Sequence, residues 1–338
     1  MTSTEQTATM PVAGSPRKMK AVAQTKYGSS AAVELRDVDV PVIEDHQVLV
    51  RVRASSVNPA EWYAVMGPFF VRPSSGLLKP KRAEIGADLA GTVEAVGKDV
   101  TEFQPGDEVF GTSLGAWAEY ARSREPRLVK KPDNVSFEEA ASVPVAALTA
   151  LQALRDHGNV QPGQKVLING ASGGVGSFAV QIAKALGAEV TAVCSTHNVE
   201  TARTMGADVV CDYTQEDFTK SGKRHDLMLD IAGSRPVREF SRVLTPEATL
   251  VMVGGPMNAG LGPLPHIVAT MVSARVRGRN LKNFVAKIEK DDLLFMQELL
   301  ATGKVKPVID RTYPLSDVRK ALDYLGEGHA RGKIVLTM

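Results

Sequence analysis

The chain has 338 residues, of which 43% are hydrophobic and 23% charged, and its formal net charge is +2. This length exceeds the ~250–300 residues at which a single core stops growing, so we expect two domains. The ordinary composition excludes a disordered or fibrous chain, and the small net charge with interspersed signs argues against a nucleic-acid partner.

Residues 1–18 are predicted to form a flexible tail, because they are rich in Thr, Ser, Pro and Gly and lack the apolar core of a signal peptide. No later apolar run approaches the ~20 residues needed to cross a bilayer. We therefore expect a cytoplasmic protein with no membrane partner. The two cysteines, Cys194 and Cys211, are too few for a disulfide framework or a four-thiolate zinc site.

Residues 19–145 are predicted to form a first domain, which reads as all-β. Short alternating segments such as MKAVAQT, QVLVRVRAS and AGTVEAVG are separated by turns such as QPGDEVFG. After Phe137 the sequence becomes helical, with Ser136 as a plausible cap ahead of two glutamates. A domain boundary is expected near this point.

Residues 146–278 alternate strand and helix, as in KVLING, VGSFAVQIAKALG, EVTAVCS, VETARTMG and DVVCDY. This alternation is typical of a doubly wound parallel sheet of the Rossmann type, and so of an α/β protein. Residues 279–338 then contain two amphipathic helices and a closing strand, GKIVLTM. We expect this segment to return to the first domain and complete it.

The most informative local feature is a glycine-rich turn between a five-residue apolar strand and a long helix. Small residues allow the backbone to turn tightly and to approach a pyrophosphate at the positive end of the helix. Glycines also occur in turns that bind nothing, but here strand, turn, helix and second strand follow in the required order. The candidate dinucleotide-binding residues are Ala171, Ser172, Gly173, Gly174, Val175 and Gly176.

The end of the next predicted strand bears on the choice of cofactor. NAD sites commonly place an acidic residue there for the ribose 2′-hydroxyl, whereas this strand ends in VCSTHN without a carboxylate. A 2′-phosphate would meet Ser195, Thr196 and His197, which favours NADPH. The alternative is that these residues form a polar turn that caps the next helix, a role that Asn198 would also serve.

The chain resembles the quinone oxidoreductase (zeta-crystallin-like) branch of the medium-chain dehydrogenase/reductase superfamily over nearly its whole length from Met19. The resemblance is carried by SSVNPAEWYAVMG at 55–67, IGADLAGTVEAVGKDVTEFQPGDEVFG at 85–111, ASVPVAALTALQAL at 141–154, NGASGGVGSFAVQIAKALGA at 169–188, GADVVCDYTQEDF at 206–218 and HARGKIVL at 329–336. It implies a GroES-like β domain followed by a Rossmann domain. It also implies a homodimer joined through the edges of the Rossmann sheets, with the strand around VRGRNL as the candidate.

Zinc-dependent members of the superfamily carry a cysteine and a histidine ligand at two places where this chain has Asn58 and Ala87. They also carry four clustered cysteines for a structural zinc, and no cysteine precedes Cys194 here. The resemblance therefore implies a zinc-independent protein with no metal site. A different site built from His46, His157 or His225 is the alternative.

The resemblance also implies roles for individual residues. Asn58 and Tyr63 match positions that line the nicotinamide and the substrate carbonyl, where they would hydrogen-bond a developing oxyanion without a metal. Their alternative roles are a turn residue and a core aromatic. Further cofactor candidates are Thr149, Tyr213, Ala232, Val253, Gly254, Gly255 and Lys333. Thr149 could instead bond back to its own helix, and Lys333 could be an ordinary strand-end lysine.

The function expected from the resemblance is hydride transfer from NADPH to a quinone or an α,β-unsaturated carbonyl. No residue identifies itself as an essential acid or base. Three alternatives stay open. The first is an enoyl-thioester reductase, for which the basic segment 66–83 would admit an acyl-carrier or coenzyme A arm. The others are a non-catalytic NADPH-binding protein and an alcohol dehydrogenase, which should need zinc.

Overall fold

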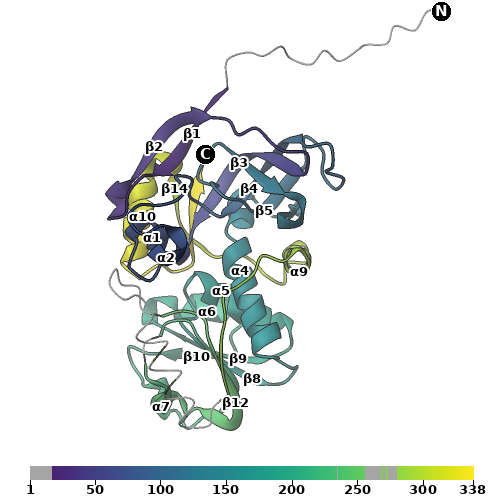
Figure 1. Cartoon of the computed structure of the whole chain (residues 1–338). Helices are drawn as coiled ribbons and strands as arrows, with labels where there is room; N and C mark the ends of the chain where they lie inside the picture. Colours follow the sequence, from purple (N-terminus) through teal and green to yellow (C-terminus); the bar gives the residue numbers. More distant parts are fainter. Residues whose placement is uncertain (1–16, 234, 256–267, 269–271, 273–279) are drawn as a thin grey trace, which may run out of the picture.

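Two β-sheets organise the computed structural model, which describes residues 17–233, 235–255, 268, 272 and 280–338. In Figure 1 the sheet built from the first third of the chain lies above the sheet built from its middle third, and α4 lies between them. The helices of the described residues are α1 (Pro59–Met66), α2 (Arg72–Ser75), α3 (Phe137–Ala141), α4 (Pro144–Gln152), α5 (Gly174–Ala185), α6 (Val199–Thr204), α7 (Val237–Phe240), α9 (Lys290–Ala301) and α10 (Val318–Gly326). None of them is both long and apolar enough to span a membrane.

The upper sheet has the order β14-β15-β3-β4-β5-β7, and β6 also pairs with β3. Its strands are β3 (Gln47–Val57), β4 (Asp88–Val96), β5 (Glu108–Thr112), β6 (Tyr120–Arg124), β7 (Leu128–Lys130), β14 (Ile309–Pro314) and β15 (Lys333–Thr337). β1 (Lys18–Gln24) and β2 (Val33–Asp39) form a separate antiparallel pair. The last strand, β15, is antiparallel to β3 and sets Ile334 opposite Val57. This register brings the last strand of the chain against β3 and places Lys333 beside Asn58.

The helix α1 corrects the expectation that residues 19–145 are all-β. Pro59 occupies the first helical turn, and the Glu61 side chain accepts a hydrogen bond from the backbone N–H of Asn58 at 2.9 Å. Gly67 ends the helix with φ of 60°, a left-handed conformation that glycine adopts readily. The sequence Asn-Pro-Ala-Glu thus contains the start signal of a helix.

The lower sheet is parallel throughout and has the order β10-β9-β8-β11-β12-β13. Its strands are β8 (Lys165–Asn169), β9 (Glu189–Cys194), β10 (Val209–Asp212), β11 (His225–Asp230), β12 (Leu244–Met252) and β13 (Asn280–Asn283). This is the 3-2-1-4-5-6 order of a Rossmann sheet, so the predicted doubly wound architecture is confirmed. The chain reverses direction across the sheet between β8 and β11, the position at which such sheets bind their ligands.

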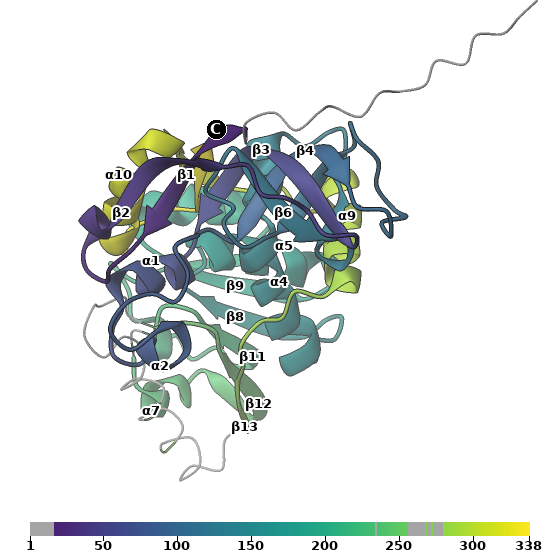
Figure 2. The same ribbon diagram turned by 45° about the horizontal axis from the view of Figure 1, so that its top comes forward.

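A set of hydrogen bonds fixes the C-terminal segment against α4. The Gln152 amide donates to the backbone carbonyl of Lys287 and accepts from its N–H, at 2.8 and 3.0 Å. Gln152 and Arg155 also both donate to the buried carboxylate of Asp292, at 2.6 and 2.7 Å. These contacts hold α9 beside α4 on one side of the molecule (Figure 2).

The cap predicted at Ser136 is confirmed. Its hydroxyl accepts from the N–H of Glu139 at 3.1 Å, and the Glu139 carboxylate accepts from the N–H of Ser136 at 2.9 Å. This reciprocal pair starts α3, and α4 follows it directly. The chain therefore passes from the upper sheet to the lower one through a helical segment.

Candidate functional site

The glycine-rich turn joins β8 to α5, and its backbone leaves no room for side chains at two positions. A Cβ atom at Gly176 would lie 2.0 Å from the Gly170 carbonyl oxygen. Gly170 itself has φ of 92°, which L side chains rarely adopt. At Gly173, just before the helix, a Cβ atom would lie 3.8 Å from the Gly170 carbonyl oxygen, an ordinary contact distance. This bare helix start is a cradle that fits the pyrophosphate of a dinucleotide.

The other predicted cofactor residues are brought to the same edge of the lower sheet. Ser195, Thr196 and His197 follow β9, and Tyr213 follows β10. Ala232 follows β11, where its N–H bonds the Asn169 carbonyl at 3.2 Å, so it lies against the turn. Val253, Gly254 and Gly255 follow β12. Parallel strands end at one edge, which is why residues far apart in sequence converge here.

A carboxylate adjoins the position predicted for a 2′-phosphate. The Thr196 hydroxyl donates to Asp212 at 2.5 Å, and Asp212 also accepts from the hydroxyl of Thr214 at 2.8 Å. These hydrogen bonds, together with nearby His197, hold the pKa of Asp212 below its usual value. The sequence argument missed Asp212 because it ends β10, where it pairs with Cys194 of β9. A bound phosphate would therefore have a negative charge as its neighbour.

A buried polar cluster, formed by Asn58, Glu61, Asp88 and Lys333, lies at the N-terminal end of α1. We call it the Lys333 cluster. Exposure of its members is 2%, 6%, 0% and 3%, respectively. The Lys333 ammonium donates to Asn58 Oδ1 at 2.5 Å and lies 3.6 Å from Asp88 Oδ2. The amide nitrogen of Asn58 in turn donates to Asp88 Oδ2 at 2.9 Å. Asn58 thus bridges a buried ion pair.

Two further donors stabilise the Asp88 carboxylate. The Ser56 hydroxyl donates to Oδ2 at 2.5 Å, and the backbone N–H of Val145, in the first turn of α4, donates to Oδ1 at 2.9 Å. The Glu61 carboxylate has fewer hydrogen-bond donors. Apart from its own backbone, the donor to it is the backbone N–H of Asn58. The two buried carboxyl groups therefore have different environments.

The pKa values of the cluster reflect its burial. Loss of hydration raises the pKa of Glu61 to about 7, and the negative charge of Asp88 acts in the same direction. Burial lowers the pKa of Lys333, against the attraction of Asp88 and Glu61. Groups with such shifts in a protein interior are candidates for proton transfer.

The Lys333 cluster and the glycine-rich turn meet. A Cβ atom at Gly174 would lie 3.1 Å from Cδ of Lys333, so the lysine side chain passes over the start of α5. Lys333, for which an ordinary strand-end lysine was the alternative role, is therefore buried between the two sheets. This contact joins the cofactor cradle to α1.

Tyr63 and Thr149 lie near this junction with different surroundings. Tyr63 is half-buried on α1, and its ring makes edge contacts with Trp62 and Phe70 at centroid distances of 5.1 and 5.5 Å. The Thr149 hydroxyl donates to the Val145 carbonyl at 2.6 Å, which is the alternative role considered for it. Tyr63 thus belongs to the group near α1, while the Thr149 hydroxyl is used within its own helix.

Sequence reasoning missed Glu61 and Asp88, although signals for both were present. Glu61 stands three residues after Asn58, the spacing of a helix cap, and Asp88 follows Ala87 within IGADLAG. Neither motif reveals that the carboxyl groups are buried. That property depends on the pairing of β15 with β3, which brings Lys333 to them.

The residues that the structure describes contain no group of three or more His, Cys, Asp or Glu side chains arranged to hold a metal ion. His225 is buried and bonded to the Val243 carbonyl and the Thr191 hydroxyl, and burial lowers its pKa. His157 stacks on Phe284. The histidines considered for a separate metal site are thus dispersed.

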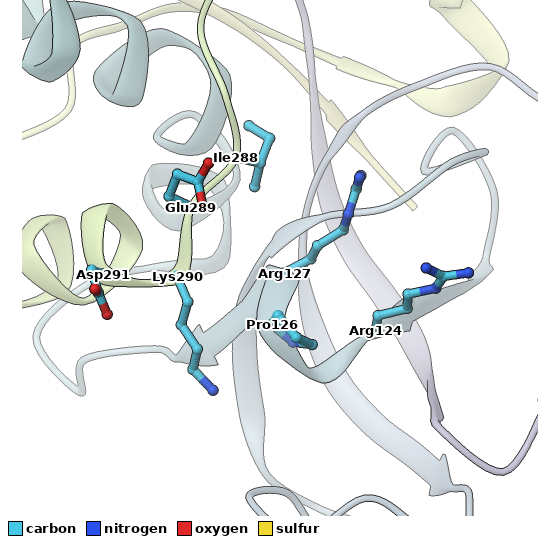
Figure 3. Close-up of a pocket in the computed structure, with 7 residues that line it drawn as sticks. All are labelled: Arg124, Pro126, Arg127, Ile288, Glu289, Lys290 and Asp291. Atoms are coloured by element: carbon cyan, nitrogen blue, oxygen red, sulfur yellow. The ribbon is translucent and has the colours of Figure 1, made fainter.

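A surface pocket of about 350 Å³ lies where η2 (Glu125–Arg127) faces the start of α9 (Figure 3). Its lining residues are Arg124, Pro126, Arg127, Ile288, Glu289, Lys290 and Asp291. The charges are of both signs, and Lys290 is paired with Glu102. The pocket contains none of the predicted site residues, so the chemistry is assigned to the junction described above.

Two family models match the chain. Residues 44–133 match the alcohol dehydrogenase GroES-like domain, and residues 205–336 match a domain described as zinc-binding dehydrogenase. The first match covers β3 to β7, and the second includes Asp212 and Lys333. Each match covers strands of one or both sheets, although residues 134–204, with β8 and β9, lie between the two matches. The fold implies a nicotinamide cofactor.

Individual relatives match over almost the whole chain. It is 35% identical to the chloroplast envelope quinone oxidoreductase homolog of Arabidopsis thaliana, over 94% of this chain and 98% of that protein. It is 31% identical to the chloroplastic NADPH-dependent alkenal/one oxidoreductase of the same plant, over 95% and 80%. The structure of the quinone oxidoreductase from Coxiella burnetii superposes with a TM-score of 0.83 at 28% identity, covering 95% of this chain and 100% of that one.

The glycine cradle yields a first prediction. Gly176→Ala is expected to lower the free energy of unfolding by about 1–3 kcal/mol and to abolish dinucleotide binding, because its Cβ would collide with the Gly170 carbonyl. Gly173→Ala, with 3.8 Å to its nearest neighbour, serves as the matched control and should keep near-native stability. Urea unfolding of both variants provides the measurement, and equal stabilities would contradict the cradle.

Glu61 yields a second prediction, on stability. Its pKa is about 7 in the folded protein against an ordinary 4.5, so between these pH values the folded chain binds one more proton than the unfolded chain. Its contribution to the free energy of unfolding therefore falls by about 3 kcal/mol as pH rises across this window, and stays level above it. Glu61→Gln removes this dependence. Urea unfolding at pH 5, 6, 7 and 8 should show a wild-type minus variant difference that declines with pH, and a constant difference would contradict it.

Proposed function

Because the chain belongs to the medium-chain dehydrogenase/reductase superfamily, with quinone oxidoreductases among its relatives, we propose that it is a zinc-independent, NADPH-dependent reductase of quinones or α,β-unsaturated carbonyls. The observation that carries this proposal is the contact between Gly174 of the cofactor cradle and Lys333 of the buried cluster. It brings the Lys333 side chain to the start of α5, beside which the cofactor is proposed to bind.

In this proposal the glycine-rich turn binds the pyrophosphate, and the residues after β9 and β10 bind the adenosine end. NADPH, when bound, supplies the hydride. The chain holds cofactor and acceptor together, which replaces an encounter in solution by a reaction within one complex. Tyr63, on α1, is proposed to contact the acceptor, and the Lys333 ammonium stabilises negative charge that develops on its oxygen.

The proposed zinc-independence rests on the position of Asn58 and on its contacts. It stands where zinc-dependent members carry a cysteine ligand, and its amide is engaged by both Asp88 and Lys333. A cation supplied by the chain itself thus occupies the neighbourhood of that position. Lys333 offers a charge that a bound metal would otherwise contribute.

We also propose that the protein is a homodimer joined at the edge of the lower sheet. β13 is the edge strand in the described part of that sheet, and its pairing with β12 leaves one side free of a strand neighbour. The predicted strand VRGRNL begins in residues 276–279, which lie outside the described residues. Pairing of two such edges would continue the sheet from one subunit to the other.

The test of the function is cofactor oxidation by chelator-treated protein. NADPH and NADH are each offered with a quinone, a 2-alkenal, an enoyl thioester and a saturated ketone, and NADP⁺ with a primary alcohol. We expect chelator-resistant oxidation of NADPH with the quinone or the alkenal. Turnover only with the thioester would assign the alternative reductase activity. Binding of NADPH without turnover, or alcohol oxidation that requires zinc, would contradict the proposal.

His197 yields a prediction on cofactor selectivity. Replacement by lysine puts an ammonium group beside Thr196 and Asp212 in place of an imidazole. His197→Lys should therefore tighten NADPH binding roughly tenfold at pH 8 and leave NADH binding unchanged. Fluorescence titration with both nucleotides measures this, with the exposed His46→Lys as control. Equal tightening for NADH would show that the 2′-phosphate is not bound here.

A further inference from the structure

We propose that Lys333 donates the proton that completes reduction of the acceptor. Glu61 then supplies the proton that restores the Lys333 ammonium. This inference rests on the proposed function for its acceptor, and it adds Glu61, which the sequence did not identify, to the predicted candidate Lys333. Hydride transfer alone leaves a quinone or an enone with an unbalanced negative charge. A proton must follow, and the Lys333 cluster is placed to supply it.

The charges of the Lys333 cluster do not balance when all its groups are ionised. Two carboxyl groups, Glu61 and Asp88, share a buried region with one ammonium, Lys333. If all three were ionised, the cluster would carry one uncompensated negative charge on side chains that are at most 6% exposed. Such a charge is costly, and the usual outcome is that one group takes up a proton. The cluster as a whole therefore holds one proton more than three fully ionised groups would.

The hydrogen bonds of the two carboxyl groups indicate which of them holds this proton. Asp88 accepts from Ser56, Asn58 and the Val145 N–H, with Lys333 as its counter-ion, and these donors favour the carboxylate. Glu61 lacks such a set of donors. The extra proton therefore resides on Glu61, in agreement with the raised pKa of its carboxyl group.

The charged surroundings of Glu61 support the same assignment. Asp88 of β4 and Lys333 of β15 are the charged groups that act on it. The elements packed against α1 present apolar side chains to it, among them Ala32 of η1 (Ser30–Ala32) and Leu322 of α10. The cations of α10 bond elsewhere, Arg319 to the Val33 carbonyl and Lys320 to Asp317.

The Lys333 ammonium is placed to donate a proton. Its ammonium has three N–H bonds, of which one is directed to Asn58 and another side faces Asp88. Its methylene chain passes over Gly174, so its position links the cluster to the cofactor cradle. Burial lowers the pKa of Lys333, which makes the ammonium a stronger acid than an exposed lysine.

The reaction balances with these groups. A nicotinamide bound at the glycine-rich turn would supply the hydride, and Lys333 would face the negative charge that the acceptor oxygen then carries. The N–H bond of Lys333 breaks as an O–H bond forms on the acceptor, leaving a neutral amine. The carboxyl proton of Glu61 then passes to the amine, and the Glu61 carboxylate recovers a proton from water. The net reaction consumes one hydride and one proton for each acceptor.

The test compares three variants over the range pH 5.5 to 9, with kcat for the quinone or enone and NADPH affinity measured for each. Lys333→Arg keeps the positive charge and the pairing with Asp88 but does not release a proton. Lys333→Met removes both. We expect each to lower kcat on the order of 100-fold. Urea unfolding of Lys333→Arg, compared with that of the wild type, guards against loss of folding.

Glu61→Gln tests whether Glu61 supplies the proton that restores the Lys333 ammonium. Wild-type kcat should fall as pH rises past about 7, where Glu61 loses its proton. This inflection should be absent in Glu61→Gln, whereas the exposed Glu298→Gln control should retain the wild-type profile. A wild-type kcat in Lys333→Arg overturns the role of Lys333, and an unchanged inflection in Glu61→Gln overturns that of Glu61. A wild-type protein that reduces no acceptor would instead refute the proposed function.

Discussion

The buried contact of Lys333 with Asn58, Asp88 and Gly174 is the constraint on which the site depends. Each partner comes from a different segment: Asn58 from the start of α1, Asp88 from β4 and Gly174 from the start of α5. The lysine itself begins the last strand of the chain. Only when β15 pairs with β3 in its observed register do these segments meet. The C-terminal strand therefore completes the site as well as the upper sheet.

The energetics of this contact favour specificity more than stability. A buried ion pair gains little over a well-packed apolar pair, yet removing one partner costs ~3–5 kcal/mol because it leaves the other charge unpaired. The surrounding hydrogen bonds from Ser56 and Val145 then serve to keep Asp88 ionised in place. Val145 belongs to α4, the helix between the two sheets, so the same carboxylate ties that helix to the upper sheet. This arrangement makes the geometry of the site sensitive to the relative position of the two sheets.

Much of the fold follows from local sequence patterns. The alternation of apolar strand and helix predicted the parallel sheet, and the glycines between Gly170 and Gly176 predicted its ligand-binding turn. The helix α1 was missed because alternating apolar residues led us to predict strands in the first third of the chain, although Pro59 and Glu61 mark a helix start. The predicted cofactor preference and the roles of Tyr63 and Thr149 stay predictions.

Asn58 and Lys333 of the cluster were candidates from the resemblance, but Glu61 and Asp88, and the contact of all four residues, could not be found from local patterns. Glu61, Asp88 and Lys333 are separated by long stretches of chain, and charged residues are most often exposed. Their burial and mutual contact arise from strand register, which no local pattern specifies. The same holds for Asp212, which reaches the predicted phosphate position from a neighbouring strand. Sequence reasoning locates the chemistry of a turn well, but it does not show which charges the fold will bury together.

The most direct test of this account is a titration of the Glu61 carboxyl group itself by carbon-13 NMR of protein labelled at its glutamate side chains, with Glu61→Gln used to assign the resonance. The account predicts one carboxyl resonance, absent from the variant, with a midpoint near 7. A midpoint below ~5, as in an exposed glutamate, would contradict the buried proton and the mechanism built on it.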